Sequence, residues 1–187
     1  VPDSVFAMTM ESDRPTCFIA MPISMDDPHV KTYTDPQHWA HVMEYLFVPA
    51  IKKAGYKPIP PAAQGTSMIH ARIVEHLVES DLVLVDLSQH NPNVLFELGV
   101  RTSVDRPVVL VKDEHLRLPF DINGLNTHQY ASGIERWVLD DEIARLAQHI
   151  TATKTASGET NPLWARFGIA ITAEAPMSAG DPSDARL

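Results

Sequence analysis

The sequence has little cysteine, few basic residues and no long hydrophobic run. Cys17 is the single cysteine among 187 residues, which excludes an intrachain disulfide and a cysteine-based zinc cluster. The 15 Lys and Arg residues are outnumbered by 24 Asp and Glu, for a formal net charge of −9. Nucleic-acid binding depends on clustered basic residues, so we expect no DNA or RNA partner. No run of about 20 apolar residues occurs, so we also expect no membrane partner.

The first residues of the sequence also lack the basic-then-apolar order of a signal peptide. Together with the single cysteine, this favours a reducing, cytoplasmic location. The hydrophobic fraction of 44% and the charged fraction of 21% are those of a globular protein. We expect an irregular segment at residues 1–15, one α/β domain at 16–154, and a C-terminal tail at 155–187 that packs in part and is then disordered.

Short, continuous apolar runs alternate along the chain with segments of helical periodicity. The apolar runs predict buried strands at residues 17–21, 82–86 and 107–111. A short strand at 57–61, limited by its prolines, and a last strand at 127–130 complete the set. Apolar positions three and four residues apart predict helices at residues 35–54, from 67 onward, at 91–103 and at 133–153. This alternation predicts a single doubly wound, flavodoxin- or Rossmann-like α/β domain with a mainly parallel sheet of about five strands.

Single residues of these helices carry three further expectations. Asp35 and Pro36 supply an N-cap and a first helical residue. Pro49 should kink or divide the helix that follows. Val74 and Trp137 belong to apolar stripes that should face the sheet.

Open α/β sheets bind ligands beyond the carboxyl ends of their strands, where loops meet the first turns of helices. Three segments should meet at that edge, at residues 21–24, 61–67 and 86–97. In the first of them, Met21, Pro22 and Ser24 are candidates for substrate contacts, because backbone amides and a hydroxyl can hold a ribose or a phosphate.

The third segment is the most informative of the three. Asp86 ends an apolar run, and Asn91 and Asn93 open the next helix. Glu97 lies about 1.5 turns into that helix. Its flanking residues are apolar and the rest of the helix is predicted to be buried, where a carboxylate is costly unless it faces a cleft or is paired. We therefore expect Glu97 and Asp86 to be catalytic, and Asn91 and Asn93 to bind the substrate.

Several of these residues also have a structural explanation. Asn91 is a good N-cap by itself, and Asp86 can cap the same loop. Glu97 can pair with Arg101 at the i,i+4 spacing. Ser88 is a further candidate for substrate binding, and a serine hydrolase is not expected because no GxSxG motif surrounds it.

Four motifs together resemble the nucleoside 2-deoxyribosyltransferase-like superfamily, which is related to enzymatic TIR domains. The motifs are CFIAMPIS at 17–24, SDLVLVDLS at 80–88, NPNVLFELG at 91–99 and PFD at 119–121. The resemblance implies that Glu97, in the Glu-Leu-Gly motif, is the nucleophile. Asn91 stands where the transferases have an acidic residue that helps to bind the base, so the resemblance does not fix which base leaves. The Asn-Pro-Asn variant resembles nucleotide-consuming or signalling domains of bacterial defence systems, and some TIR relatives cleave NAD.

The implied chemistry suits these residues. Cleavage of a C1′–N bond passes through an oxocarbenium-like transition state, which Glu97 can stabilise or attack. A neutral base needs a proton to leave, for which Asp86 or a nearby histidine could serve, whereas nicotinamide leaves NAD from a cationic form. We expect hydrolysis or transfer at the glycosidic bond of a nucleoside, nucleotide or NAD. The alternatives are a non-catalytic nucleotide-sensing module and a TIR-like assembly domain.

The nine histidines do not follow the spacing of a metal site. No HExxH or comparable motif occurs among them, so we expect neither a metal nor another cofactor. Relatives complete their sites across subunits, so the resemblance implies a homo-oligomer.

Overall fold

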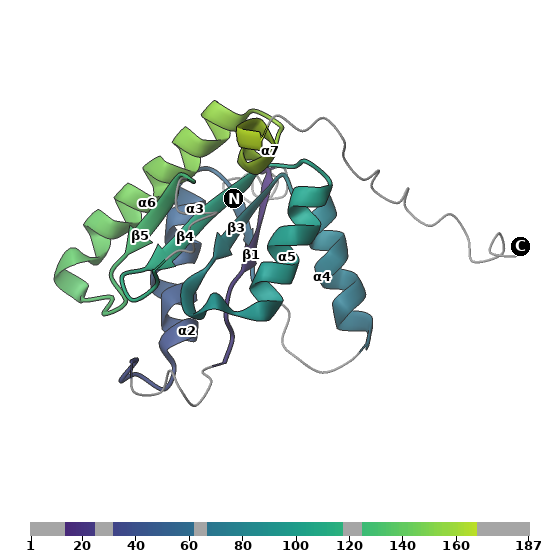
Figure 1. Cartoon of the computed structure of the whole chain (residues 1–187). Helices are drawn as coiled ribbons and strands as arrows, with labels where there is room; N and C mark the ends of the chain where they lie inside the picture. Colours follow the sequence, from purple (N-terminus) through teal and green to yellow (C-terminus); the bar gives the residue numbers. More distant parts are fainter. Residues whose placement is uncertain (1–13, 25–31, 62–66, 118–124, 168–187) are drawn as a thin grey trace, which may run out of the picture.

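A computed structural model describes residues 14–24, 32–61, 67–117 and 125–167. Five parallel strands form one sheet in the order β2-β1-β3-β4-β5 (Figure 1). The strands are β1 (Thr16–Ala20), β2 (Lys57–Ile59), β3 (Leu82–Asp86), β4 (Val108–Asp113) and β5 (Thr127–Tyr130). The prediction of a single α/β domain with a parallel sheet is confirmed. Residues 1–13 and 168–187, for which an irregular segment and a disordered end were predicted, lie outside the described residues.

The central strands are covered on both faces. All five residues of β3 are buried, and β1 is paired with it from Cys17 opposite Leu82 to Ala20 opposite Val85. A strand buried on both faces has no polar alternation, which is why it appears in the sequence as a continuous apolar run. Strand β4 runs to Asp113, two residues beyond its predicted end. Lys112 and Asp113 are polar and do not extend the apolar run in the sequence, but they continue the pairing with β5.

Helices cover the two faces of the sheet (Figure 1). The helices are α2 (His38–His41), the π-helical segment η2 (Val42–Phe47), α3 (Val48–Lys53), α4 (Ser67–Glu79), the 3-10 turn η3 (Ser88–His90), α5 (Pro92–Ser103), α6 (Arg136–Ser157) and α7 (Pro162–Phe167). One hydrophobic core joins Ile19 and Leu84 of the sheet to Leu46 and Leu146. The other joins the opposite face of the sheet to α4 and α5.

The helix before β2 starts later than predicted, and it changes from α to π-helical and back to α while its backbone stays helical at both boundaries. Asp35 and Pro36 lie in a turn, in which the Asp35 carboxylate accepts a hydrogen bond from the Gln37 amide at 2.9 Å, and the helix begins at His38. The prediction of an N-cap at Asp35 was therefore wrong. Pro49 stands in the first turn of α3, directly after the π-helical segment, where its missing N–H is tolerated.

Two apolar side chains predicted to face the sheet are exposed. Trp137 is 78% exposed, because it lies five residues before Glu142, or about 140° around α6 from the buried stripe. Val74 is 36% exposed, on the edge of the stripe that buries Leu77 completely. Periodicity alone shows that an apolar stripe exists, but it does not fix the stripe's edges.

The segment after β5 packs on the domain. Helix α6 continues past residue 154 to Ser157, and Asn161 is completely buried, with its amide donating to Asp105 Oδ1 at 2.8 Å. The Trp164 indole donates to the Thr102 carbonyl at the end of α5. Within the described part of the chain, no helix has the length and apolar character needed to cross a membrane.

Candidate functional site

The strand order reverses between β1 and β3, which makes their carboxyl ends a topological switch point where ligands commonly bind. After β1, Met21 and Pro22 are buried and Ser24 is exposed. After β3 come η3 and the start of α5. Two of the predicted site segments therefore share one edge of the sheet. Most of the third, at 62–66, lies outside the described residues.

Asn91 caps helix α5. Its side-chain oxygen accepts hydrogen bonds from the amides of Asn93 at 3.0 Å and Val94 at 3.4 Å. N-capping is the structural role that the sequence allowed for Asn91, and these two hydrogen bonds engage the side-chain oxygen. The Asn93 side chain is exposed at the first turn of the helix. Contacts of both residues with a substrate stay a prediction.

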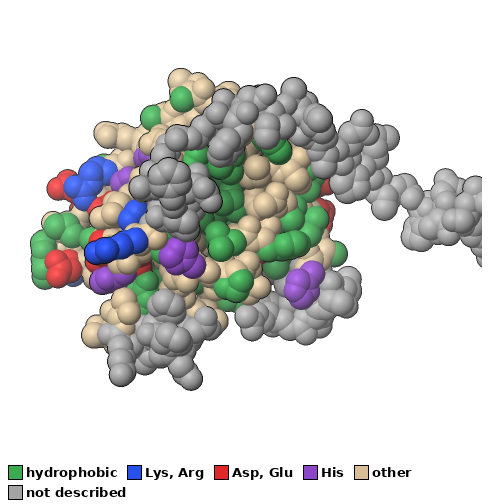
Figure 2. Space-filling view, in the orientation of Figure 1, with side chains coloured by type: hydrophobic (Ala, Val, Ile, Leu, Met, Phe, Trp, Pro, Cys, Tyr) green, Lys and Arg blue, Asp and Glu red, His purple; other side chains and the backbone are tan. Residues whose placement is uncertain are grey.

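Glu97 lies in the middle of α5, half-buried beside the face that packs on the sheet. That face is formed by Val94, Leu98 and Arg101. The expectation that the other residues of this helix are buried was wrong, since Leu95 is 40% and Phe96 is 65% exposed. A run of adjacent apolar residues cannot all face the sheet from a helix of 3.6 residues per turn. Figure 2 shows apolar side chains at the surface over the region of α4 and α5.

No other described residue forms a hydrogen bond or an ion pair with Glu97. Arg101, its possible i,i+4 partner, is completely buried and donates instead to the Pro107 carbonyl at 3.0 and 2.9 Å and to the Leu77 carbonyl at 2.8 Å. Burial raises the pKa of the Glu97 carboxyl to about 7. Glu97 is thus a partly desolvated carboxylate whose charge is not neutralised by Arg101.

Asp86 and Ser88 belong to a buried network at the carboxyl ends of three strands. Both are completely buried. The Asp86 carboxylate accepts hydrogen bonds from the Ser88 hydroxyl at 2.6 Å and amide at 3.0 Å, and from the Tyr130 hydroxyl at 2.8 Å. Burial raises the pKa of Asp86 to about 7. Because Asp86 is completely buried, its position suits holding Ser88 and Tyr130 in place better than direct contact with a ligand.

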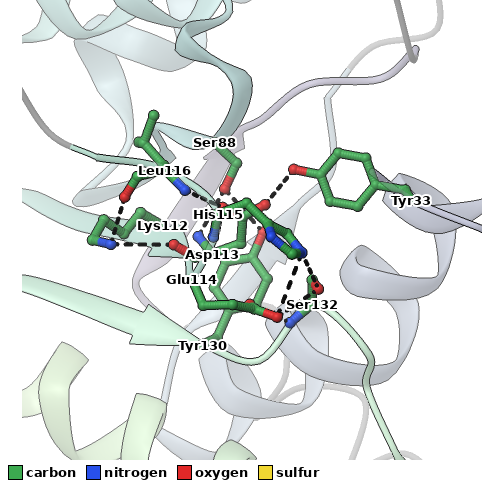
Figure 3. A network of polar contacts seen from close by, with 9 residues as sticks. All are labelled: Tyr33, Ser88, Lys112, Asp113, Glu114, His115, Leu116, Tyr130 and Ser132. Atoms are coloured by element: carbon green, nitrogen blue, oxygen red, sulfur yellow. Dashed lines mark hydrogen bonds and ion pairs between the residues drawn. The ribbon is translucent and has the colours of Figure 1, made fainter. Parts of the chain in front are cut away.

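Asp113 extends this network to two loops. The Ser88 hydroxyl accepts a hydrogen bond from the Asp113 amide at 2.9 Å. The Asp113 carboxylate accepts from the Tyr33 hydroxyl and from the amides of His115 at 3.1 Å and Leu116 at 3.0 Å (Figure 3). Asp113 thereby fixes the loop after β4 against the segment before α2.

The raised pKa of Asp86 predicts a stability that falls with pH. Below about pH 4 both the folded and unfolded chains hold this proton, while towards pH 7 only the folded chain keeps it, so the free energy of unfolding declines between these values. In an Asp86→Asn variant, this decline should be smaller by on the order of 4 kcal/mol. Urea unfolding of both proteins from pH 4 to 8 measures the difference.

Asp81 gives a control of opposite sign. Burial raises the pKa of Asp81, but the hydrogen bonds from the Thr16 amide and hydroxyl together hold it below its ordinary value. An Asp81→Asn variant should therefore lose stability near pH 7 and little at low pH. Equal pH slopes in the wild type and in Asp86→Asn would show that Asp86 is ionised in the folded protein throughout this range.

Two cavities open at the carboxyl ends of β3, β4 and β5, and both are lined by Thr32 and Tyr33. One of about 300 Å³ is lined also by His38, His41, Tyr45 and Ser132. The other, of about 360 Å³, is lined also by Gln89, His90, His115 and Arg117. Glu97 lines neither cavity. Among the residues described, no group of three or more His, Cys, Asp and Glu side chains could hold a metal ion.

Tyr33, His38, Asp113 and Tyr130 were not among the site residues predicted from the sequence. Asp113 is the last residue of the buried strand β4, as Asp86 is of β3. The same pattern of an apolar run followed by a carboxylate was therefore present in the sequence, two residues beyond the predicted end of β4. Tyr33 is 80 residues from its partner Asp113. A contact at that separation leaves no local pattern in the sequence.

No protein-family model matches the chain, and no curated protein matches it. Among solved structures, the chain is similar to a 2-desoxiribosyltransferase from Leishmania mexicana, with 18% sequence identity and a TM-score of 0.38. The match covers 52% of this chain and 64% of the Leishmania protein, so this chain spans less than two thirds of the length of that protein.

Proposed function

We propose that this chain is an enzyme that breaks the N-glycosidic bond of a nucleoside, nucleotide or NAD, by hydrolysis or by transfer of the sugar, with Glu97 as nucleophile. One observation carries the proposal: Glu97 is a half-buried carboxylate, without a partner among the described residues, on the helix that follows the switch-point strand β3. The Glu-Leu-Gly motif and its flanking residues support the same assignment through their resemblance to nucleoside 2-deoxyribosyltransferases.

The reaction runs in two displacements at C1′ of the sugar. A Glu97 carboxylate oxygen forms a bond to C1′ while the C1′–N bond breaks and its electron pair leaves with the base. Water or an acceptor base, which gives up a proton to the solvent, then attacks C1′ and displaces the Glu97 carboxylate. The oxocarbenium character of both transition states is stabilised by a nearby negative charge, and more strongly where water is partly excluded.

The other predicted residues would bind and position the substrate. Ser24 and Asn93 have exposed side chains at the carboxyl edge, so they are placed to contact sugar hydroxyls or a phosphate. Met21 and Pro22 are buried and would contribute through their backbone or by packing. Ser88 and Asp86, which are completely buried, would act by holding the loop that leads into α5.

The identity of the leaving group follows from how it is protonated. A neutral base must receive a proton as the bond breaks, and Asp86 has no exposed surface from which to donate it. Nicotinamide in NAD is already cationic before cleavage and needs no acid. Among the three substrate classes, we therefore rank NAD first.

The test is the release of free base. The protein is incubated at low and high concentration with NAD, ribonucleosides, deoxyribonucleosides and their monophosphates, and free base is quantified by liquid chromatography. We expect release from at least one compound, and from NAD before the others. Tight binding of a nucleotide that stays intact would replace the enzyme with a nucleotide-sensing module. Turnover only at high concentration would indicate an assembly-dependent domain.

The rate should depend on pH through Glu97. A nucleophilic carboxylate must be ionised, and its pKa is about 7 in the folded protein, so kcat/KM should rise about tenfold per pH unit below pH 7 and level off above it. The measurement is kcat/KM from pH 5 to 9 on the best substrate. A rate that instead increases as the pH falls below 7 would assign Glu97 the role of a proton donor.

A further inference from the structure

Among the described residues, the most exposed large apolar side chain is that of Trp137, in the first turn of α6. It is 78% exposed, whereas Trp39 is 4% exposed and the Trp164 indole donates to the Thr102 carbonyl. An indole in water leaves a large apolar area uncovered and contributes little to stability. Tryptophan is also enriched at the energetic centres of protein interfaces. Trp137 therefore indicates a surface that meets a partner.

A second exposed aromatic side chain lies near the start of α6. Tyr45 is 47% exposed in η2, a segment that contacts α6. Tyr45 and Ile134 line the same cavity of about 300 Å³, and Ile134 precedes Trp137 by three residues. Both η2 and α6 pack on the core across the sheet from α4 and α5 (Figure 1). These two aromatic side chains thus lie on the other face of the sheet from the helix that carries Glu97.

Exposed carboxylates accompany the two aromatic side chains. Asp140 and Asp141 follow Trp137 by three and four residues, which places all three on one side of α6. Glu135 and Glu44, beside the start of α6 and beside Tyr45, are exposed as well. No described residue forms a hydrogen bond or an ion pair with these four carboxylates. We call this surface the Trp137 face, and it consists of Glu44, Tyr45, Glu135, Trp137, Asp140 and Asp141.

The charge of the Trp137 face selects its partner. Arg136 is the single cation within residues 44–45 and 135–141, against four carboxylates. Two copies of such a surface repel each other, so the face does not suit association with a second copy of the same face. An acidic partner is disfavoured for the same reason. A basic partner is attracted, and exposed aromatic rings add a contact that cationic groups favour.

We propose that the Trp137 face binds a basic segment of a partner protein, one that presents several Lys or Arg side chains. One cationic group lies over the Trp137 ring, and others pair with Asp140 and Asp141. The aliphatic part of a further basic side chain packs beside the Tyr45 ring, at the cavity that Tyr45 lines. Binding at this face does not depend on Glu97 or on cleavage of a glycosidic bond.

The test is the fluorescence anisotropy of a labelled peptide of alternating Arg and Ala, titrated with the full chain at physiological salt. We expect saturable binding that Trp137→Ala weakens about tenfold, with a smaller loss in Trp137→Phe because a ring remains. The double variant Asp140→Asn, Asp141→Asn should also weaken binding about tenfold and reduce its dependence on salt. A peptide of alternating Glu and Ala should not bind.

Matched controls lie on the other face of the sheet. The double variant Glu75→Gln, Glu79→Gln removes two exposed carboxylates of α4 and should leave the affinity for the Arg peptide unchanged. Because Trp137, Asp140 and Asp141 are exposed, their variants should melt as the wild type does.

Four results would overturn this proposal. The first is no binding of the Arg peptide by the wild type at millimolar concentration. The second is unchanged affinity in Trp137→Ala. The third is an equal loss in the Glu75 and Glu79 double variant, which would show attraction by net charge alone. The fourth is a dimer in sedimentation that Trp137→Ala dissociates, which would assign the face to a second copy. Base release tests Glu97 separately from all of these.

Discussion

Replacement of Glu97 by Gln should lower kcat about a thousandfold or more and change KM little. The side chain keeps its size and its place on α5, but an amide can neither attack C1′ nor balance the positive charge that develops on the sugar. Loss of an interaction made only in the transition state appears in kcat and in kcat/KM together. Steady-state kinetics of base release on the best substrate measure both constants.

Two controls accompany the Glu97→Gln variant. Glu79→Gln changes an exposed carboxylate on the neighbouring helix α4 and should leave kcat unchanged. The melting temperature of Glu97→Gln near pH 7 should equal or exceed that of the wild type, since the substitution removes a half-buried carboxylate without a described partner. Turnover at the wild-type rate in Glu97→Gln would transfer the nucleophile to another residue. A loss of binding with unchanged kcat would make Glu97 a ribose-binding group.

Substitution of Arg101 by Ala should destabilise the fold by about 3–5 kcal/mol. The completely buried guanidinium joins the end of α4, through the Leu77 carbonyl, to the residue before β4, through the Pro107 carbonyl. Its removal leaves a cavity and two buried carbonyls without their donor. Urea unfolding monitored by tryptophan fluorescence measures the change.

Two further variants separate the causes of this loss. Arg101→Met keeps most of the volume but still leaves both carbonyls unpaired, so it should lose about 2 kcal/mol. Arg72→Ala, on the exposed surface of α4, should stay within about 0.5 kcal/mol of the wild type. If Arg101→Met is as stable as the wild type, the hydrogen bonds of Arg101 contribute nothing and its role is packing alone.

The fold was predictable because its central strands are short and continuously apolar. Strands β3 and β5 occupy the residues that the sequence predicted, and α5 begins and ends as its Asn91 cap and periodicity indicate. The edges of the helical stripes were less predictable. Trp137 shares the spacing of its neighbours only loosely, and which turn of α6 meets the sheet is decided by tertiary packing.

The candidate site was predictable only in part. Glu97, Asp86 and Asn91 lie close together in sequence, so one segment displays them all. The sequence could not show that Arg101 bonds to the carbonyls of Leu77 and Pro107 rather than to Glu97, because Leu77 is 24 residues away. It also could not show the two cavities that Tyr33 lines, because their lining comes from four separate stretches of chain.

The most direct test of the account is to trap the intermediate on Glu97. The analogue is the 2′-fluoro-arabinosyl form of whichever compound releases base, because fluorine disfavours the oxocarbenium-like transition states and lets a glycosyl-enzyme accumulate. Peptide mass mapping should then find one sugar bonded to the peptide that contains Glu97, and none in Glu97→Gln. An adduct on another residue, or turnover with an inverted C1′ product and no adduct, would contradict the account.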